Sequence, residues 1–228
     1  MIRVALLALA LVLAGCGGDE GHAGTATLWV TRDRGAHVLY DGEVPAGLTA
    51  MQALDRKMDV ETRYGGRFVH SIDGVDGDAA KQRDWFWYVN GIEGDRSAAE
   101  YRLRDGDVEW WDYRSWRGQM RVPVVVGAFP EPFLHGYAGK RGRVEVAVEQ
   151  RGLAADDPEL RRVVGKLKRI VHAGSPGRAD YVLMIGGNEP FRASRTNGAI
   201  VFRISARDAE RLAADPKLAK LRYQGLRP

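Results

Sequence analysis

The sequence WFWYVNG, at residues 85–91, decides the fold of the first half of this 228-residue chain. Five strand-forming residues in a row are closed by Asn90-Gly91, a pair typical of a tight turn between strands. Successive side chains of a strand point to opposite faces, so the odd-numbered residues of this stretch share one face and the even-numbered residues the other. One face must cover a core, and only the other can meet a ligand.

The sequence around this stretch predicts an α+β fold with one helix on a mixed sheet, a β-grasp-like arrangement. TAMQ at residues 49–52 has the pattern of a helix capping box, and Met51, Leu54 and Met58 then mark one helical face. Trp110 and Trp111 should lie on opposite faces of the last strand. Alternating apolar residues or turn pairs predict strands at 25–30, 35–40, 60–64, 68–72, 85–89 and 108–113.

A second unit follows, with a different charge. Residues 121–126, 144–148, 181–185, 199–204 and 218–223 predict strands, and helices should begin after Asp157 and Ser205. From residue 144 onward this order is βαββαβ, so we expect a small α/β sandwich with a ferredoxin-like arrangement. We identify no family in this half.

Charge and composition support two folded bodies. The chain is 45% hydrophobic and 28% charged, which excludes wholesale disorder. Residues 16–116 hold 12 Lys and Arg against 19 Asp and Glu, whereas residues 117–228 hold 21 against 11. We therefore predict domains at 25–116 and 117–228. The basic charge of the second has three interpretations: a solvated face, attraction to anionic lipid headgroups, or docking against the acidic first body or an acidic partner.

The N-terminal sequence predicts a secretion signal and a membrane anchor. Residues 4–13 are an unbroken apolar run, too short to span a bilayer and typical of a secretory signal. LAGC at residues 13–16 resembles a bacterial lipobox, which implies that residues 1–15 are removed and that Cys16 carries lipid. Residues 17–24 would be a glycine-rich tether. The alternative is an ordinary signal peptide with a chance cysteine. Either interpretation places the protein outside the cytoplasm, and the first anchors it to a bacterial membrane.

Three blocks of the first half carry a family resemblance. WFWYVNG at 85–91, SAAEY at 97–101 and DGDVEW at 105–110 resemble the C-terminal β-domain of the vitamin B12 carriers transcobalamin and intrinsic factor. That domain also occurs as a module of bacterial surface lipoproteins. The resemblance covers residues 25–116.

The resemblance implies a set of ligand contacts from the aromatic strand and the loop after it. In the carriers, this domain lies over one face of a corrinoid, opposite a large helical domain that precedes it; here only a signal and a tether stand there. Phe129 and Phe133 are therefore candidates for a second wall. The implied cobalamin contacts are Trp85, Trp87, Tyr88, Gly91, Ile92, Asp95, Arg96 and Ser97, and we favour the row of Trp85 and Trp87 for the ligand side.

The sequence carries no recognisable catalytic or metal-binding motif. The five histidines have no paired spacing, which argues against a catalytic zinc, and the acidic run at residues 73–78 lacks the order of an EF-hand. Nucleic acid is a poor partner outside the cytosol. We therefore expect no enzyme, no metal and no cofactor beyond the Cys16 lipid, with a cobalamin-like ligand passed to a transporter. The alternative is an envelope interaction or scaffolding module with no small-molecule ligand.

Overall fold

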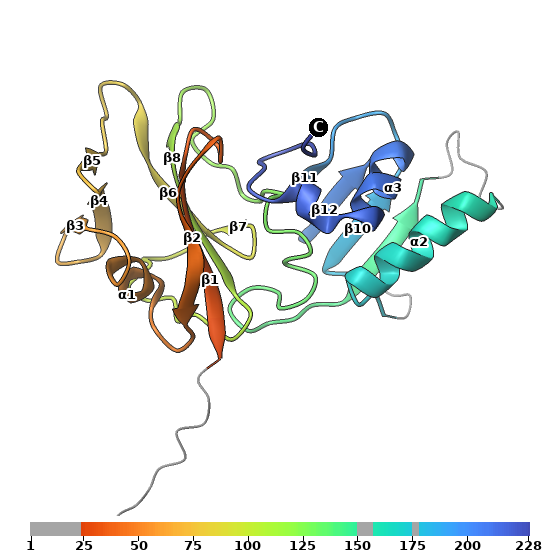
Figure 1. The fold of residues 1–228 in the computed structure, drawn as a ribbon, viewed down its shortest axis with the longest axis horizontal. Helices are drawn as coiled ribbons and strands as arrows, with labels where there is room; N and C mark the ends of the chain where they lie inside the picture. The colour runs from red at the N-terminus through yellow and green to blue at the C-terminus, as the bar shows by residue number, and fades with distance from the viewer. Residues whose placement is uncertain (1–23, 150–156, 175–177) are drawn as a thin grey trace, which may run out of the picture.

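The computed structural model describes residues 24–149, 157–174 and 178–228 (Figure 1). The first half is built on a five-stranded sheet of order β2-β1-β8-β6-β7. Strand β1 lies parallel to β8, and the pairs β1–β2, β6–β8 and β6–β7 are antiparallel. The strands are β1 (Thr25–Arg32), β2 (His37–Pro45), β6 (Arg83–Val89), β7 (Ile92–Glu93) and β8 (Val108–Ser115).

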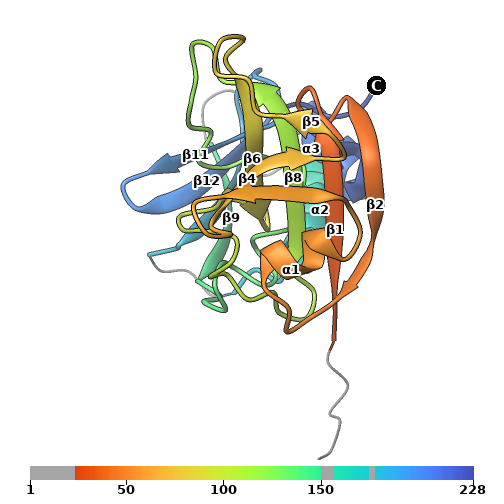
Figure 2. The ribbon, with the colours of Figure 1, turned by 90° about the vertical axis from the view of Figure 1, so that its left-hand side faces the viewer.

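One helix and a small second sheet cover one face of this sheet (Figure 2). Helix α1 (Ala50–Asp55) begins at Thr49, and the predicted capping box is present: the Thr49 hydroxyl accepts from the Gln52 amide, and the Gln52 side chain accepts from the Thr49 amide. The small sheet has the order β3-β4-β5. Its strands are β3 (Val60–Arg63), β4 (Phe68–Ile72) and β5 (Val75–Asp76).

The second half has a four-stranded sheet of order β11-β12-β10-β9. Helices α2 and α3 pack against this sheet, and their buried residues form one hydrophobic core with it. Strand β10 lies between β9 and β12 and is parallel to both. The elements are β9 (Val144–Val148), α2 (Pro158–Ile170), β10 (Tyr181–Ile185), β11 (Arg192–Thr196), β12 (Ala199–Ile204), α3 (Ala206–Ala214) and the short 3-10 helix η1 (Pro216–Ala219).

The α+β class is confirmed, but the ferredoxin-like arrangement is wrong. In a split βαβ unit another strand separates the two parallel strands, whereas here β9 and β10 pair directly. The expected last strand at 218–223 is absent from the described residues, because η1 and turns occupy that segment. The expected strand at 121–126 is reduced to a bridge between Val124 and Ile92. Pro123 in its middle lacks the amide that a longer ladder needs.

The two halves share a core. Trp29, Tyr88 and Trp110 of the first sheet pack against Val125, Ala128 and Leu221 of the second half. Trp111 lies on the opposite face with α1, as the alternation of the strand predicts. The second half thus covers the face of the first sheet that α1 leaves open (Figure 1). Two ion pairs add to this contact, Lys220 Nζ to Asp41 Oδ2 at 2.6 Å and Arg121 Nε to Glu93 Oε2 at 3.3 Å.

Candidate functional site

The faces of β6 decide where its aromatic residues lie. Trp85 and Val89 belong to the core that contains α1, and Trp87 packs against it. Tyr88 and Phe86 lie on the other face, against the second half. The expectation that the Trp85 and Trp87 row faces Phe129 and Phe133 is therefore wrong, because this row packs with the α1 core and the Phe86 and Tyr88 row meets the second half.

Trp85 is a core residue and Trp87 is not. Trp85 is 5% exposed, and its indole Nε1 donates to the Val75 carbonyl at 2.7 Å. Trp87 is half-buried and stacks on Trp111, with ring centroids 6.0 Å apart and planes 21° apart. Gly94 lies against this ring, because a Cβ at Gly94 would stand 2.1 Å from Trp87 Cε2. Trp87 is therefore the indole of β6 that remains in reach of a ligand.

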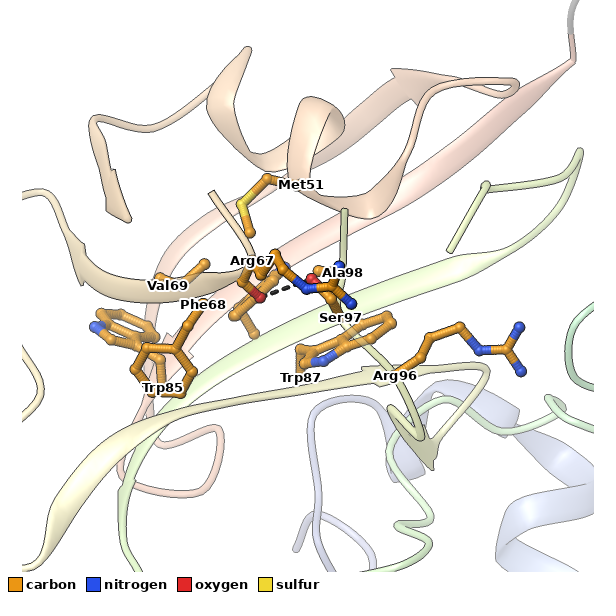
Figure 3. Close-up of a pocket in the computed structure, with 10 residues that line it drawn as sticks. Met51, Arg67, Phe68, Val69, Trp85, Trp87, Arg96, Ser97 and Ala98 are labelled. Carbon is orange, nitrogen blue, oxygen red and sulfur yellow. Dashed lines mark hydrogen bonds between the residues drawn. The ribbon is translucent and has the colours of Figure 1, made fainter. Parts of the chain in front are cut away.

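A hollow of about 360 Å³, here called the Trp87 hollow, opens beside this indole (Figure 3). Its walls come from α1, β4, β6, β8 and the loop after β7. Ser97 Oγ donates to the Arg67 carbonyl at 2.6 Å, which ties this loop to the start of β4. The lining residues are Met51, Arg67, Phe68, Val69, Trp85, Trp87, Arg96, Ser97, Ala98 and Trp111.

A second hollow of about 350 Å³, here called the outer hollow, shares Phe68, Trp85 and Trp87 with the first. Its two carboxylates, Asp84 and Glu93, are partly buried, and burial raises the pKa of each. Its other lining residues are Ala79, Phe86, Gly94, Trp116, Met120 and Arg121.

The loop after β7 is held by an exposed charged cluster. Arg96 Nε donates to Asp95 Oδ1 at 2.7 Å, and the Tyr137 hydroxyl donates to the same oxygen at 2.7 Å. The hydrogen bond from Arg96, followed by that from Tyr137, holds the pKa of Asp95 below its usual value although partial burial opposes this. Asp95 thus positions Arg96, and Asp95 itself is not among the residues that line either hollow.

Four of the predicted site residues come together and the others do not. Trp85, Trp87, Arg96 and Ser97 line the Trp87 hollow. Tyr88 and Phe133 are fully buried, and Ile92 belongs to the core of the second half. Gly91 is buried against the second half, where an added Cβ would stand 2.7 Å from the Val125 carbonyl oxygen. Cys16 lies outside the described residues.

Phe129 lines a different hollow, of about 670 Å³, between the halves. There it shares the walls with Trp29 of β1, which is 7% exposed. Phe129 thus shares a hollow with an aromatic residue of β1 and not with the aromatic residues of β6. Lys220 stacks over the Trp29 ring at 5.1 Å and pairs with Asp41 at the same hollow.

The sequence prediction missed six residues that line the Trp87 hollow: Met51, Arg67, Phe68, Val69, Ala98 and Trp111. Phe68 begins the strand predicted at 68–72 and is 41% exposed at the start of β4. A residue at the end of a strand can remain outside the core, and only the crossing of β4 over β6 shows this (Figure 2).

Comparisons with known proteins give one family match over part of the chain and two distantly similar structures. The model of a domain of unknown function, DUF4430, matches residues 47–115. A search of curated proteins found no match. A candidate metal-binding protein from Ruminococcus gnavus ATCC 29149 is 19% identical with a TM-score of 0.34, over 40% of this chain and 97% of that one. Haptocorrin in complex with Cbi is 15% identical with a TM-score of 0.32, over 44% of this chain and 28% of haptocorrin.

Two features are absent from the part of the chain that the structure describes. The described residues contain no group of three or more His, Cys, Asp or Glu side chains placed to hold a metal ion. None of the helices within the described ranges has the length and apolar character needed to cross a membrane.

Proposed function

We propose that this protein is a non-enzymatic binding protein of the bacterial cell envelope, held to a membrane by lipid on Cys16. The observation that supports it is the gathering of four predicted contacts at one hollow: Trp85, Trp87, Arg96 and Ser97. Aromatic walls with a few polar groups at the margin are typical of small-molecule sites. The ligand would therefore be amphipathic, with an apolar surface for the indoles and polar groups for Arg96 and Ser97.

The finer proposal is a cobalamin-like corrinoid, passed on to a transporter. A corrin is a flat apolar ring edged with amides, so Trp87 would contact its face and Arg96 would donate to amide carbonyls. A hollow of about 360 Å³ accepts only an edge of such a ring. The second half packs on the opposite face of the sheet, so a partner protein would have to supply the other wall.

Titration of the mature chain with cobalamin, followed by corrin absorbance and calorimetry, tests this ligand. We expect Trp87→Leu to weaken binding roughly tenfold or more, because the indole face is lost. Leu39→Ala, on the exposed β2 strand, is the matched control and should leave binding unchanged. Absence of binding into the high micromolar range, with and without a candidate transporter, would exclude the corrinoid.

Lipid anchoring has a separate test. Two or three acyl chains hold a protein firmly on a bilayer, since each buried CH₂ contributes about 0.8 kcal/mol. We expect the wild-type chain to fractionate with membranes. The Cys16→Ser variant should either be released from the membrane, or stay there only because its signal peptide is not removed. Membrane association that is unchanged in Cys16→Ser, with normal signal removal, would contradict the anchor.

The second candidate is an envelope interaction module without a small-molecule ligand. It is supported by the position of the second half, which packs on the face of the sheet opposite to the Trp87 hollow and therefore gives that hollow no second wall. Salt-sensitive capture of one defined envelope protein, together with no cobalamin binding, would favour this candidate over the first.

A further inference from the structure

We propose that the free edge of β6 is a docking site for an extended segment of a partner protein. The segment would add to the sheet as one more strand and place alternate side chains in the Trp87 hollow and the outer hollow. This inference goes beyond small-molecule binding and does not depend on it.

One edge of β6 is unpaired over part of its length. Strand β7 pairs with β6 only at Tyr88 and Val89. At the other end, Arg83 exchanges two backbone hydrogen bonds with Asp78, of 3.0 and 2.9 Å. Between these points, residues 84–87 have no strand partner on the side away from β8 within the described chain. An unpaired edge is a template for an added strand.

Backbone amide and carbonyl groups of β6 point toward this unpaired edge. The Gln82 carbonyl accepts from Trp116 on the β8 side, whereas the Trp87 carbonyl accepts from Gly94 on the opposite side. Backbone groups alternate along a strand, so the Trp85 carbonyl and the Trp87 amide also point to the free side. Asp84 Oδ1 accepts from the Trp85 amide at 2.8 Å. One residue of a parallel strand, placed opposite Phe86, would bond to the Trp85 carbonyl and the Trp87 amide together.

The Trp87 hollow and the outer hollow lie on either side of this edge. The Trp87 hollow reaches the α1 face of the sheet through Met51 and Trp111, and the outer hollow reaches the other face through Phe86. Both are lined by Trp85 and Trp87, so they flank one stretch of edge. Side chains of an added strand alternate between two faces, and pockets on both faces give such docking its specificity.

The surface around this edge is mainly apolar. The described chain has five exposed large hydrophobic residues, and three of them gather here: Tyr64, Phe68 and Met120. Tyr64 contacts Phe68 edge to face at 6.2 Å. Exposed apolar clusters of this kind mark protein contacts. Both charged residues that line the Trp87 hollow are arginines, and each already pairs with a carboxylate of this chain, Arg67 with Glu100 and Arg96 with Asp95. The segment that fits is therefore apolar on both faces.

The test uses the mature chain with Cys16→Ser and a phage-displayed library of random 12-residue peptides. We expect enrichment of peptides with consecutive apolar residues. Binding of a synthetic peptide from this set should slow hydrogen exchange of the Trp87 amide roughly tenfold or more, because that amide gains a partner. N-methylation of one backbone amide of the peptide should abolish binding, because that amide can no longer donate to the Trp85 carbonyl. Binding through apolar contacts alone would survive this change.

Two substitutions of exposed side chains complete the test. Phe68→Asp should weaken peptide binding roughly tenfold or more. Val38→Asp, on the other edge strand and 51% exposed, should leave it unchanged. No enriched peptide, unchanged Trp87 exchange in the complex, or equal loss in both variants would overturn the proposal. Cobalamin binding is measured separately, so its failure leaves this result unaffected.

Discussion

Glu109 accepts a hydrogen bond of 2.6 Å from the Trp111 indole nitrogen, two residues along the same strand. The Glu109 side chain has no exposed surface, and its second carboxyl oxygen has no hydrogen-bond partner among the residues that the structure describes. Burial is the main cause that raises the pKa of Glu109 well above its usual value, with the bond from Trp111 opposing it. The acid thus fixes the indole on which Trp87 stacks.

Glu109→Gln should flatten the dependence of stability on pH. The unfolded acid loses its proton near pH 4.3, whereas the folded acid keeps it to higher pH. Above pH 4.3 the unfolded state therefore binds fewer protons, and the free energy of unfolding falls by up to about 1.4 kcal/mol per pH unit until the folded acid titrates. Gln keeps the acceptor for Trp111 and cannot ionise.

Urea unfolding at a series of pH values measures this effect. Glu61→Gln, on the exposed β3 strand, should retain the wild-type slope. A wild-type slope in Glu109→Gln as well would show that Glu109 does not contribute it.

Tyr223→Phe should destabilise the contact between the halves. The Tyr223 hydroxyl donates to Asp112 Oδ2 at 2.9 Å, and Asp112 is buried. Thr31 also donates to Asp112, so the loss should be about 1–2 kcal/mol and not that of an isolated buried charge. Thermal unfolding measures it, with Tyr64→Phe, 78% exposed, as the matched control. Equal midpoints for all three proteins would refute the role of this bond.

Gly94→Ala should displace the Trp87 indole. The added Cβ would overlap the ring, so either the loop or the indole must move, at a cost of about 1–3 kcal/mol. Near-ultraviolet circular dichroism and tryptophan fluorescence should both change. Gly174→Ala is the control, because an added Cβ there meets nothing within 4 Å. Unaltered spectra in Gly94→Ala would mean that the loop yields and the indole does not.

Thr49→Ala should cost about 1 kcal/mol, because the first turn of α1 loses its capping hydroxyl. Thr49→Ser keeps the hydroxyl and should recover most of that stability. Chemical denaturation compares the three proteins. If Ser were as unstable as Ala, the methyl group and not the cap would be the important part of Thr49.

Local patterns predicted most of the elements. The strands at 144–148 and 181–185 match β9 and β10. The Thr49 cap and the opposite faces of Trp110 and Trp111 also follow from short-range geometry, and both are confirmed. Each depends on chain neighbours alone, so one sequence is enough.

Long-range relationships were the source of the errors. The pattern βαββαβ does not specify whether β9 and β10 are adjacent, and their direct pairing overturned the ferredoxin-like order. Alternation separated Trp85 from Tyr88 correctly, but not which face meets the second half. That choice depends on the contacts of Val125 and Leu221, far along the chain from β6. Phe68 was missed because its exposure depends on how β4 crosses β6.

Leu221 and Tyr223 contribute to the hydrophobic cluster that closes the first sheet, although they lie far along the chain from Trp110. A chain that emerges N-terminus first must therefore leave one side of that sheet uncovered until Leu221 has left the ribosome. A nascent chain halted before Leu221 should consequently expose Trp110 to proteases and chaperones.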